Sequence, residues 1–231
     1  MIDLGSTDFL IQVPSLPEAE LTELSSQLFD SWESYAGESL SIPDYSLFLQ
    51  VEEGSIKGMA TVGALLYAVY MGIGNYGSFI SGLQTINQQL NDVRGYLADE
   101  ASRTFPCRGT KPSTKKRGGT LASLQRLFVK VQKGELTPDA AIAQAEILLG
   151  DEVATAPGFQ RDLENAFQTC PRFPEQLALP LAEDDLQLTP HPKNPTRPTR
   201  PTPTLGPALQ FRVEVWRDSK TRLKETRVVR L

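Results

Sequence analysis

The sequence predicts an α+β fold: a small strand-helix-strand N-terminal domain with a long apolar helical element, then a small all-helical unit and a C-terminal β-hairpin. Apolar and polar residues alternate near both ends of the chain, as in strands buried on one face. Between these regions, apolar residues recur at three- and four-residue spacings, as in amphipathic helices. The 231 residues, 40% of them hydrophobic, are enough to bury a core.

The domain expected over 1–102 begins with strand and helix signals. Residues 8–13 predict a short strand, and Ser15 with Glu18 forms a capping-box pattern that starts a helix. This helix has an acidic face opposite an apolar stripe of Leu21, Leu24, Leu28, Trp32 and Tyr35. Strands are expected at 45–51 and 55–61. The order predicts an acidic helix covering one face of a short sheet.

Residues 58–83 contain no charged side chain, over a length at which a membrane-spanning helix must be considered. Six glycines interrupt the segment, so a closely packed pair of buried helices is the alternative. In the membrane interpretation, the residues that would insert are Leu65, Leu66, Val69, Met71 and Ile73. An amphipathic helix is expected to follow over 79–101.

Basic residues are concentrated in 103–119, which the composition predicts to be a linker. Lys115, Lys116 and Arg117 are the candidates here for binding anions, either phosphates or lipid headgroups. The alternatives are a flexible solvated linker or docking on the acidic N-terminal helix. Because the net charge is −5 and no sign dominates the chain, nucleic acid is not an expected partner.

Residues 120–172 predict three helices joined by short loops. The first carries the candidate interaction residues Leu124, Leu127 and Phe128, and the second starts with Thr137 as N-cap and Pro138 as the first helical residue. The segment LQRLFVKVQKGELTPDAAIAQAEILLG, residues 124–150, resembles the short helical hairpins called SHOCT domains. That resemblance implies interaction or oligomerisation without catalysis.

The C-terminal part is expected to be a linker followed by strands. Residues 173–207 are first acidic and then rich in Pro and Thr, as in a stiff spacer. Alternation over 208–231 predicts a hairpin, with Phe211, Val213 and Trp216 as candidate interaction residues. Because an isolated hairpin is marginally stable, we expect it to add to a sheet in this chain or in another.

No catalytic, cofactor-binding or metal-binding residue is predicted. The single histidine, His191, lies in the proline-rich segment, and Cys107 and Cys170 have no metal-type spacing. The G-x-G-x-x-G spacing of 72–77 does not follow a predicted strand and open a helix, as nucleotide binding requires. The acidic groups at 52–53 and 183–185 are expected to be solvated.

The sequence therefore predicts a non-enzymatic, adaptor-like protein that acts through protein-protein interaction or self-association, with no small-molecule substrate inferred. The alternative is a membrane-inserting effector or membrane-anchored protein that uses 58–83. We expect a cytoplasmic location, with the inner (cytoplasmic) membrane as the alternative.

Overall fold

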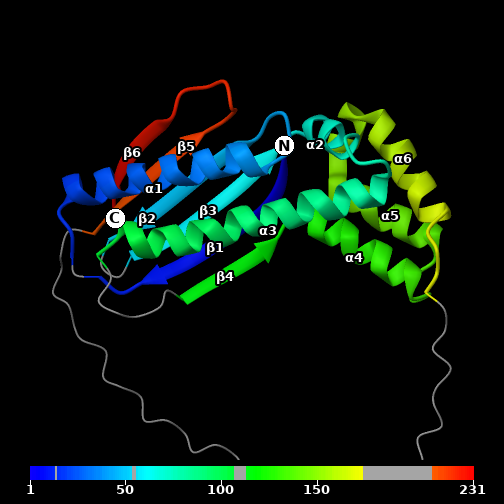
Figure 1. Cartoon of the computed structure of the whole chain (residues 1–231), viewed down its shortest axis with the longest axis horizontal. Helices are drawn as coiled ribbons and strands as arrows, with labels where there is room; N and C mark the ends of the chain where they lie inside the picture. The colour runs from blue at the N-terminus through cyan, green and yellow to red at the C-terminus, as the bar shows by residue number, and fades with distance from the viewer. Residues whose placement is uncertain (14, 54–55, 107–112, 174–209) are drawn as a thin grey trace, which may run out of the picture.

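The computed structural model describes residues 1–13, 15–53, 56–106, 113–173 and 210–231. It confirms the predicted α+β class, with a sheet of antiparallel strands and a layer of helices (Figure 1). The strands are β1 (Ile2–Ile11), β2 (Ser46–Glu52), β3 (Ile56–Ala64), β4 (Ser113–Gly118), β5 (Phe211–Arg217) and β6 (Glu225–Arg230). The helices are α1 (Glu18–Ser39), α2 (Leu66–Ile73), α3 (Phe79–Thr104), α4 (Thr120–Gln132), α5 (Pro138–Leu149), the 3₁₀ helix η1 (Gly150–Thr155) and α6 (Pro157–Gln168).

The sheet has the strand order β4-β1-β3-β2-β5-β6, and all neighbours are antiparallel. Its first four strands, connected through α1 and α3, have the β-α-β-β-α-β order of the ferredoxin-like split motif. The C-terminal hairpin β5–β6 pairs with β2 and extends this motif at one edge. The predicted hairpin therefore adds to a sheet of its own chain.

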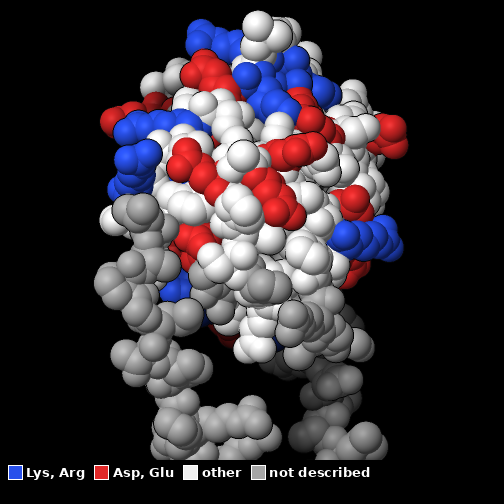
Figure 2. Space-filling view, turned by 90° about the vertical axis from the view of Figure 1, so that its left-hand side faces the viewer, with Lys and Arg blue, Asp and Glu red and all other residues white. Residues whose placement is uncertain are grey.

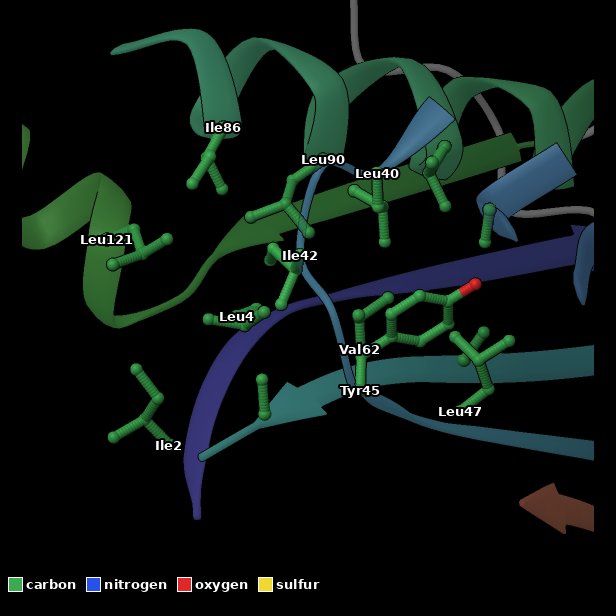
Figure 3. Packing of buried hydrophobic residues seen from close by; sticks show 14 of the residues in the cluster. Ile2, Leu4, Leu40, Ile42, Tyr45, Leu47, Val62, Ile86, Leu90 and Leu121 are labelled. Atoms are coloured by element: carbon green, nitrogen blue, oxygen red, sulfur yellow. The ribbon is translucent and has the colours of Figure 1, made fainter. Parts of the chain in front are cut away.

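The core lies between the sheet and the helices α1 and α3. Alternate residues of β2, Leu47, Leu49 and Val51, are fully buried on the helix side. Figure 3 shows Ile86 and Leu90 of α3 pointing toward the sheet. A stripe on α1 that includes Leu21, Leu28 and Trp32 is also buried, as its spacing predicts.

The helices α4, α5 and α6 form a group at one end of the sheet and pack against the start of α3 (Figure 1). Aromatic rings fill the contact: Phe128 stacks on Phe167 at 4.0 Å between ring centroids, and Phe79 meets Phe159 edge-to-face at 5.1 Å. The three predicted helices are confirmed. Thr137 caps α5, because its hydroxyl accepts a hydrogen bond from the Ala140 amide at 3.3 Å.

No single long apolar helix forms over 58–83, but the alternative of two closely packed helices is confirmed from Leu66 on, where the turn 74–78 separates α2 from α3. Most of β3, all of α2 and the start of α3 lie in this segment. Within β3, Gly58 leaves room for the Phe9 ring of the neighbouring strand, because a Cβ at position 58 would lie 1.8 Å from that ring. Within the described residues, no helix combines the length and the apolar composition that crossing a membrane requires.

Two further features differ from the sequence prediction. The basic segment 103–119 was expected to be a linker, but it contains the end of α3 and strand β4. A strand without apolar residues can form here because β4 pairs with β1 through backbone hydrogen bonds. The prediction of a capping box at Ser15 is wrong. Helix α1 begins after Pro17 with no side-chain cap, and the Ser15 hydroxyl donates a hydrogen bond to Glu53.

Candidate interaction face of the sheet

The sheet has a second face, opposite α1 and α3, on which no described helix lies (Figure 1). Strand residues alternate between the two faces. In β2 the helix-side residues are buried, whereas Ser46, Phe48, Gln50 and Glu52 are partly exposed. We call this second surface the open face.

The strand register arranges the open face in three rows that cross the sheet from β4 to β6. The first row is Arg117, Ser6, Thr61, Phe48, Trp216 and Glu225. The second row is Lys115, Asp8, Met59, Gln50, Glu214 and Arg227. The third row is Ser113, Leu10, Lys57, Glu52, Arg212 and Val229.

A group of apolar side chains lies near the centre of the open face, among polar ones. Phe48 and Trp216 are direct cross-strand partners. Aromatic side chains paired in this way stabilise a sheet. Met59 and Leu10 remain 37% and 38% exposed. The Met1 sulfur lies 3.2 Å from the hydroxyl of Ser46, the first residue of β2. The register therefore places Leu10, Met59 and Phe48 diagonally next to one another, with Trp216 opposite Phe48. Clustered exposed apolar side chains of this kind are found at interaction sites.

Charged residues border this apolar centre unevenly. On the half formed by β4, β1 and β3, the cations Lys57, Lys115 and Arg117 outnumber the single acid Asp8, which is 2.8 Å from Arg117. On the other half, three acids face two cations, and Arg212 is 3.0 Å from Glu214 and 4.0 Å from Glu52. The β4 side is therefore net positive, and the β6 side is close to neutral.

A hollow of about 360 Å³ lies on the β4 half of the open face. Its lining includes the apolar residues Leu10 and Met59. It also includes two cations, Lys57 and Lys115, and two acids, Asp8 and Glu52. The hollow therefore combines apolar contact with side chains of both charges.

The basic strand β4 is held at its edge by Arg94 of α3. This side chain is only 3% exposed, and its guanidinium donates to the carbonyls of Arg117 at 2.8 Å and Leu90 at 3.0 Å, and to Asn91 Oδ1 at 2.9 Å. Burial lowers the pKa of Arg94. Sequence reasoning missed this residue, since a lone arginine in an amphipathic helix gives no signal of where its side chain lies.

The predicted interaction residues are divided between the core and the open face. Trp216 lies on the open face. The remaining candidates are buried in the core and are not accessible to a partner: Leu124, Leu127, Phe128, Phe211 and Val213. The hairpin was expected to offer Phe211 and Val213, but its register turns them toward the helices.

The other candidates are also divided. Leu66, Val69 and Ile73 are buried, whereas Leu65 and Met71 are about half exposed on α2. Lys115, Lys116 and Arg117 are exposed on β4. Lys115 and Arg117 belong to the open face, and Lys116 lies on the helix side near Gly95.

The residues that the sequence analysis weighed for catalysis or metal binding can be placed only in part. In the part of the chain that the structure describes, no three His, Cys, Asp or Glu side chains group closely enough to hold a metal ion. Cys170 is partly buried, and burial raises the pKa of its thiol, which lowers its reactivity. His191, Cys107 and the acidic group 183–185 lie outside the described residues.

Comparisons with protein-family models, with curated proteins and with solved structures found no match to this chain. The resemblance of 124–150 to SHOCT hairpins therefore stays a prediction.

Proposed function

We propose that the protein is a non-enzymatic interaction module whose open face binds a partner protein. The partner surface is apolar at its centre and carries acidic residues where it meets β4. The observation that carries this proposal is the apolar patch around Phe48, Met59 and Trp216, bordered by the net positive β4 side. Buried aromatic contacts supply much of the affinity of such interfaces, and rim charges supply orientation and association rate.

The charge distribution favours a protein partner over nucleic acid. Aromatic side chains beside cations are also used to bind single strands. However, the four acids Asp8, Glu52, Glu214 and Glu225 lie among the five cations of the open face. Phosphates would meet these carboxylates at every row, so the face lacks the one-signed potential that backbone binding needs.

A second copy of the chain fits the open face less well than a different protein does. With a two-fold axis parallel to the strands, Lys115 would face Arg227 of the other copy and Asp8 would face Glu214. With the axis across the strands, each of these residues would face its own counterpart. The second arrangement opposes like charges throughout the second row, whereas in the first the two like-charge pairs are offset by Arg117 facing Glu225 and Lys57 facing Glu52. A heterologous partner with acids near β4 would have none of these like-charge contacts.

Site-specific photo-crosslinking in the host tests the proposal. A photoreactive phenylalanine analogue at Phe48 is expected to give a discrete adduct with another protein. The same analogue at Ile147, which is 83% exposed on α5, serves as the matched control and is expected to give none.

The captured protein is then purified and titrated into the full chain. Because Trp32 is buried and Trp216 is on the open face, binding should change the Trp216 fluorescence, and this change should vanish in W216F. Phe48→Arg should weaken binding about tenfold or more, whereas Ile147→Arg should not. Lys115→Glu combined with Arg117→Glu should mainly slow association at low salt.

Three results would overturn the proposal. Equal crosslinking at positions 48 and 147 would remove the open face as the site. An adduct with a second copy would make the protein self-associating, and an adduct sensitive to nuclease would make nucleic acid the partner.

A further inference from the structure

A second hollow, of about 460 Å³, lies at the end of the molecule that carries the helical group. The end of α2, the turn 74–78, the start of α3 and one residue of α6 line it. The aromatic residues Tyr70, Tyr76 and Phe79 are part of the lining, together with Met71 and Asp162. This hollow shares no residue with the open face.

The aromatic side chains of this hollow are held in place by specific contacts. The Tyr70 hydroxyl donates to Asp162 Oδ2 at 2.7 Å. The Tyr76 hydroxyl donates to the Ser41 hydroxyl at 2.7 Å and accepts from Gln89 Nε2 at 3.0 Å. Phe79 packs edge-to-face on Phe159. A site whose walls are fixed before binding loses little conformational entropy when a ligand enters.

Among the described residues, Asp162 is the one charged residue in the lining. Its neighbour Arg161 lies outside the lining, with Nε 3.8 Å from Asp162 Oδ1 and 76% of its side chain exposed to solvent. The hydrogen bond to Asp162, with smaller contributions from burial and charge, raises the pKa of Tyr70. The hollow thus combines aromatic walls with one negative carboxylate.

We propose that this hollow binds an alkylammonium group. Aromatic faces attract cations through the ring quadrupole, and methylated ammonium groups combine positive charge with an apolar shell that fits such walls. Asp162 supplies the opposite charge. The same chemistry is found in free choline-like molecules and in the methylated lysine side chain of a peptide, and the experiment separates these two sources.

Titration calorimetry on the full chain tests the proposal with choline and with 3,3-dimethyl-1-butanol, which has the same shape and no charge. Choline is expected to bind saturably, and the neutral alcohol is not. Asp162→Asn keeps an oxygen that accepts from Tyr70 but removes the charge, and should weaken choline binding about tenfold. Tyr76→Leu should weaken it similarly.

Tyr67→Ala is the matched control, because Tyr67 is an exposed aromatic residue of α2 outside the lining, and should leave binding unchanged. Arg161→Ala should strengthen binding, since it removes the competing cation. Urea unfolding of each variant verifies that the fold is intact.

The proposal fails if both compounds bind equally, if Asp162→Asn binds choline as the unaltered chain does, or if choline gives no saturable heat up to about 10 mM. N-acetyl-trimethyllysine amide identifies the source. Tighter binding of this compound than of choline supports a partner side chain as the ligand, and the reverse supports a free small molecule.

Discussion

Replacing Arg94 with Leu is expected to weaken the attachment of strand β4 to the rest of the fold. The guanidinium makes three hydrogen bonds, and one of them, to the Arg117 carbonyl, joins α3 directly to β4. A hydrogen bond to a charged group contributes roughly 1.5 to 3 kcal/mol. Part of the stability lost with these three bonds is recovered, because the variant has no cation to desolvate on folding. We expect a net loss of about 2 to 4 kcal/mol in the free energy of unfolding.

Urea unfolding followed by circular dichroism measures this loss, and amide hydrogen exchange localises it. The amides of 113–118 should exchange much faster in Arg94→Leu, while those of β2 and β3 follow the global stability. Arg94→Lys should recover only part of the stability, since an ammonium cannot reproduce the guanidinium geometry. A change below about 0.5 kcal/mol, or uniform exchange across the sheet, would refute the assigned role of Arg94.

Three further changes test other parts of the fold. The buried Tyr45 hydroxyl has no hydrogen-bond partner in the described part of the chain, and burial raises its pKa to about 12. Stability should therefore fall by about 2 kcal/mol through this group as the pH rises from 10 to 12, and Tyr45→Phe should reduce the dependence by that amount in urea titrations at each pH. Thr137→Ala removes the α5 cap and should cost about 1 kcal/mol, measured as a lower unfolding midpoint, whereas Thr137→Ser should cost little. Gly58→Ala places a Cβ 1.8 Å from the Phe9 ring and should lower the free energy of unfolding by up to about 3 kcal/mol in the same assay. The double variant with Phe9→Leu should recover part of that loss. An unchanged stability of Gly58→Ala alone would contradict the packing.

The elements that sequence reasoning located best are those with a clear hydrophobic period. In β2 and β5, buried Leu47, Leu49, Val213 and Val215 alternate with polar or aromatic neighbours, and the period is visible without the fold. β4 has no apolar residue and no period, because pairing with β1 and the bond from Arg94 determine its place. Such tertiary contacts leave no local trace in the sequence.

The candidate site could be predicted only in part. Alternation shows that Phe211 and Trp216 point to opposite faces of the hairpin, but it does not show which face the helices cover. That choice depends on the pairing of β5 with β2, whose own buried face is fixed by α1 and α3. A shift of one residue in register would reverse the exposure of all the hairpin side chains.

The pairing of β5 with β2 also has a consequence for how the chain acquires its structure. Leu47 lies opposite Arg217, so this contact cannot form until almost the whole described chain has left the ribosome. The helices and the first four strands can assemble earlier, and during that interval the outer edge of β2 is unpaired. Contacts between such distant residues slow folding, and unpaired strand edges are prone to wrong associations. We therefore expect the pairing of the C-terminal hairpin with β2 to be the slow step of folding. The nascent chain should be most prone to aggregation just before this pairing forms.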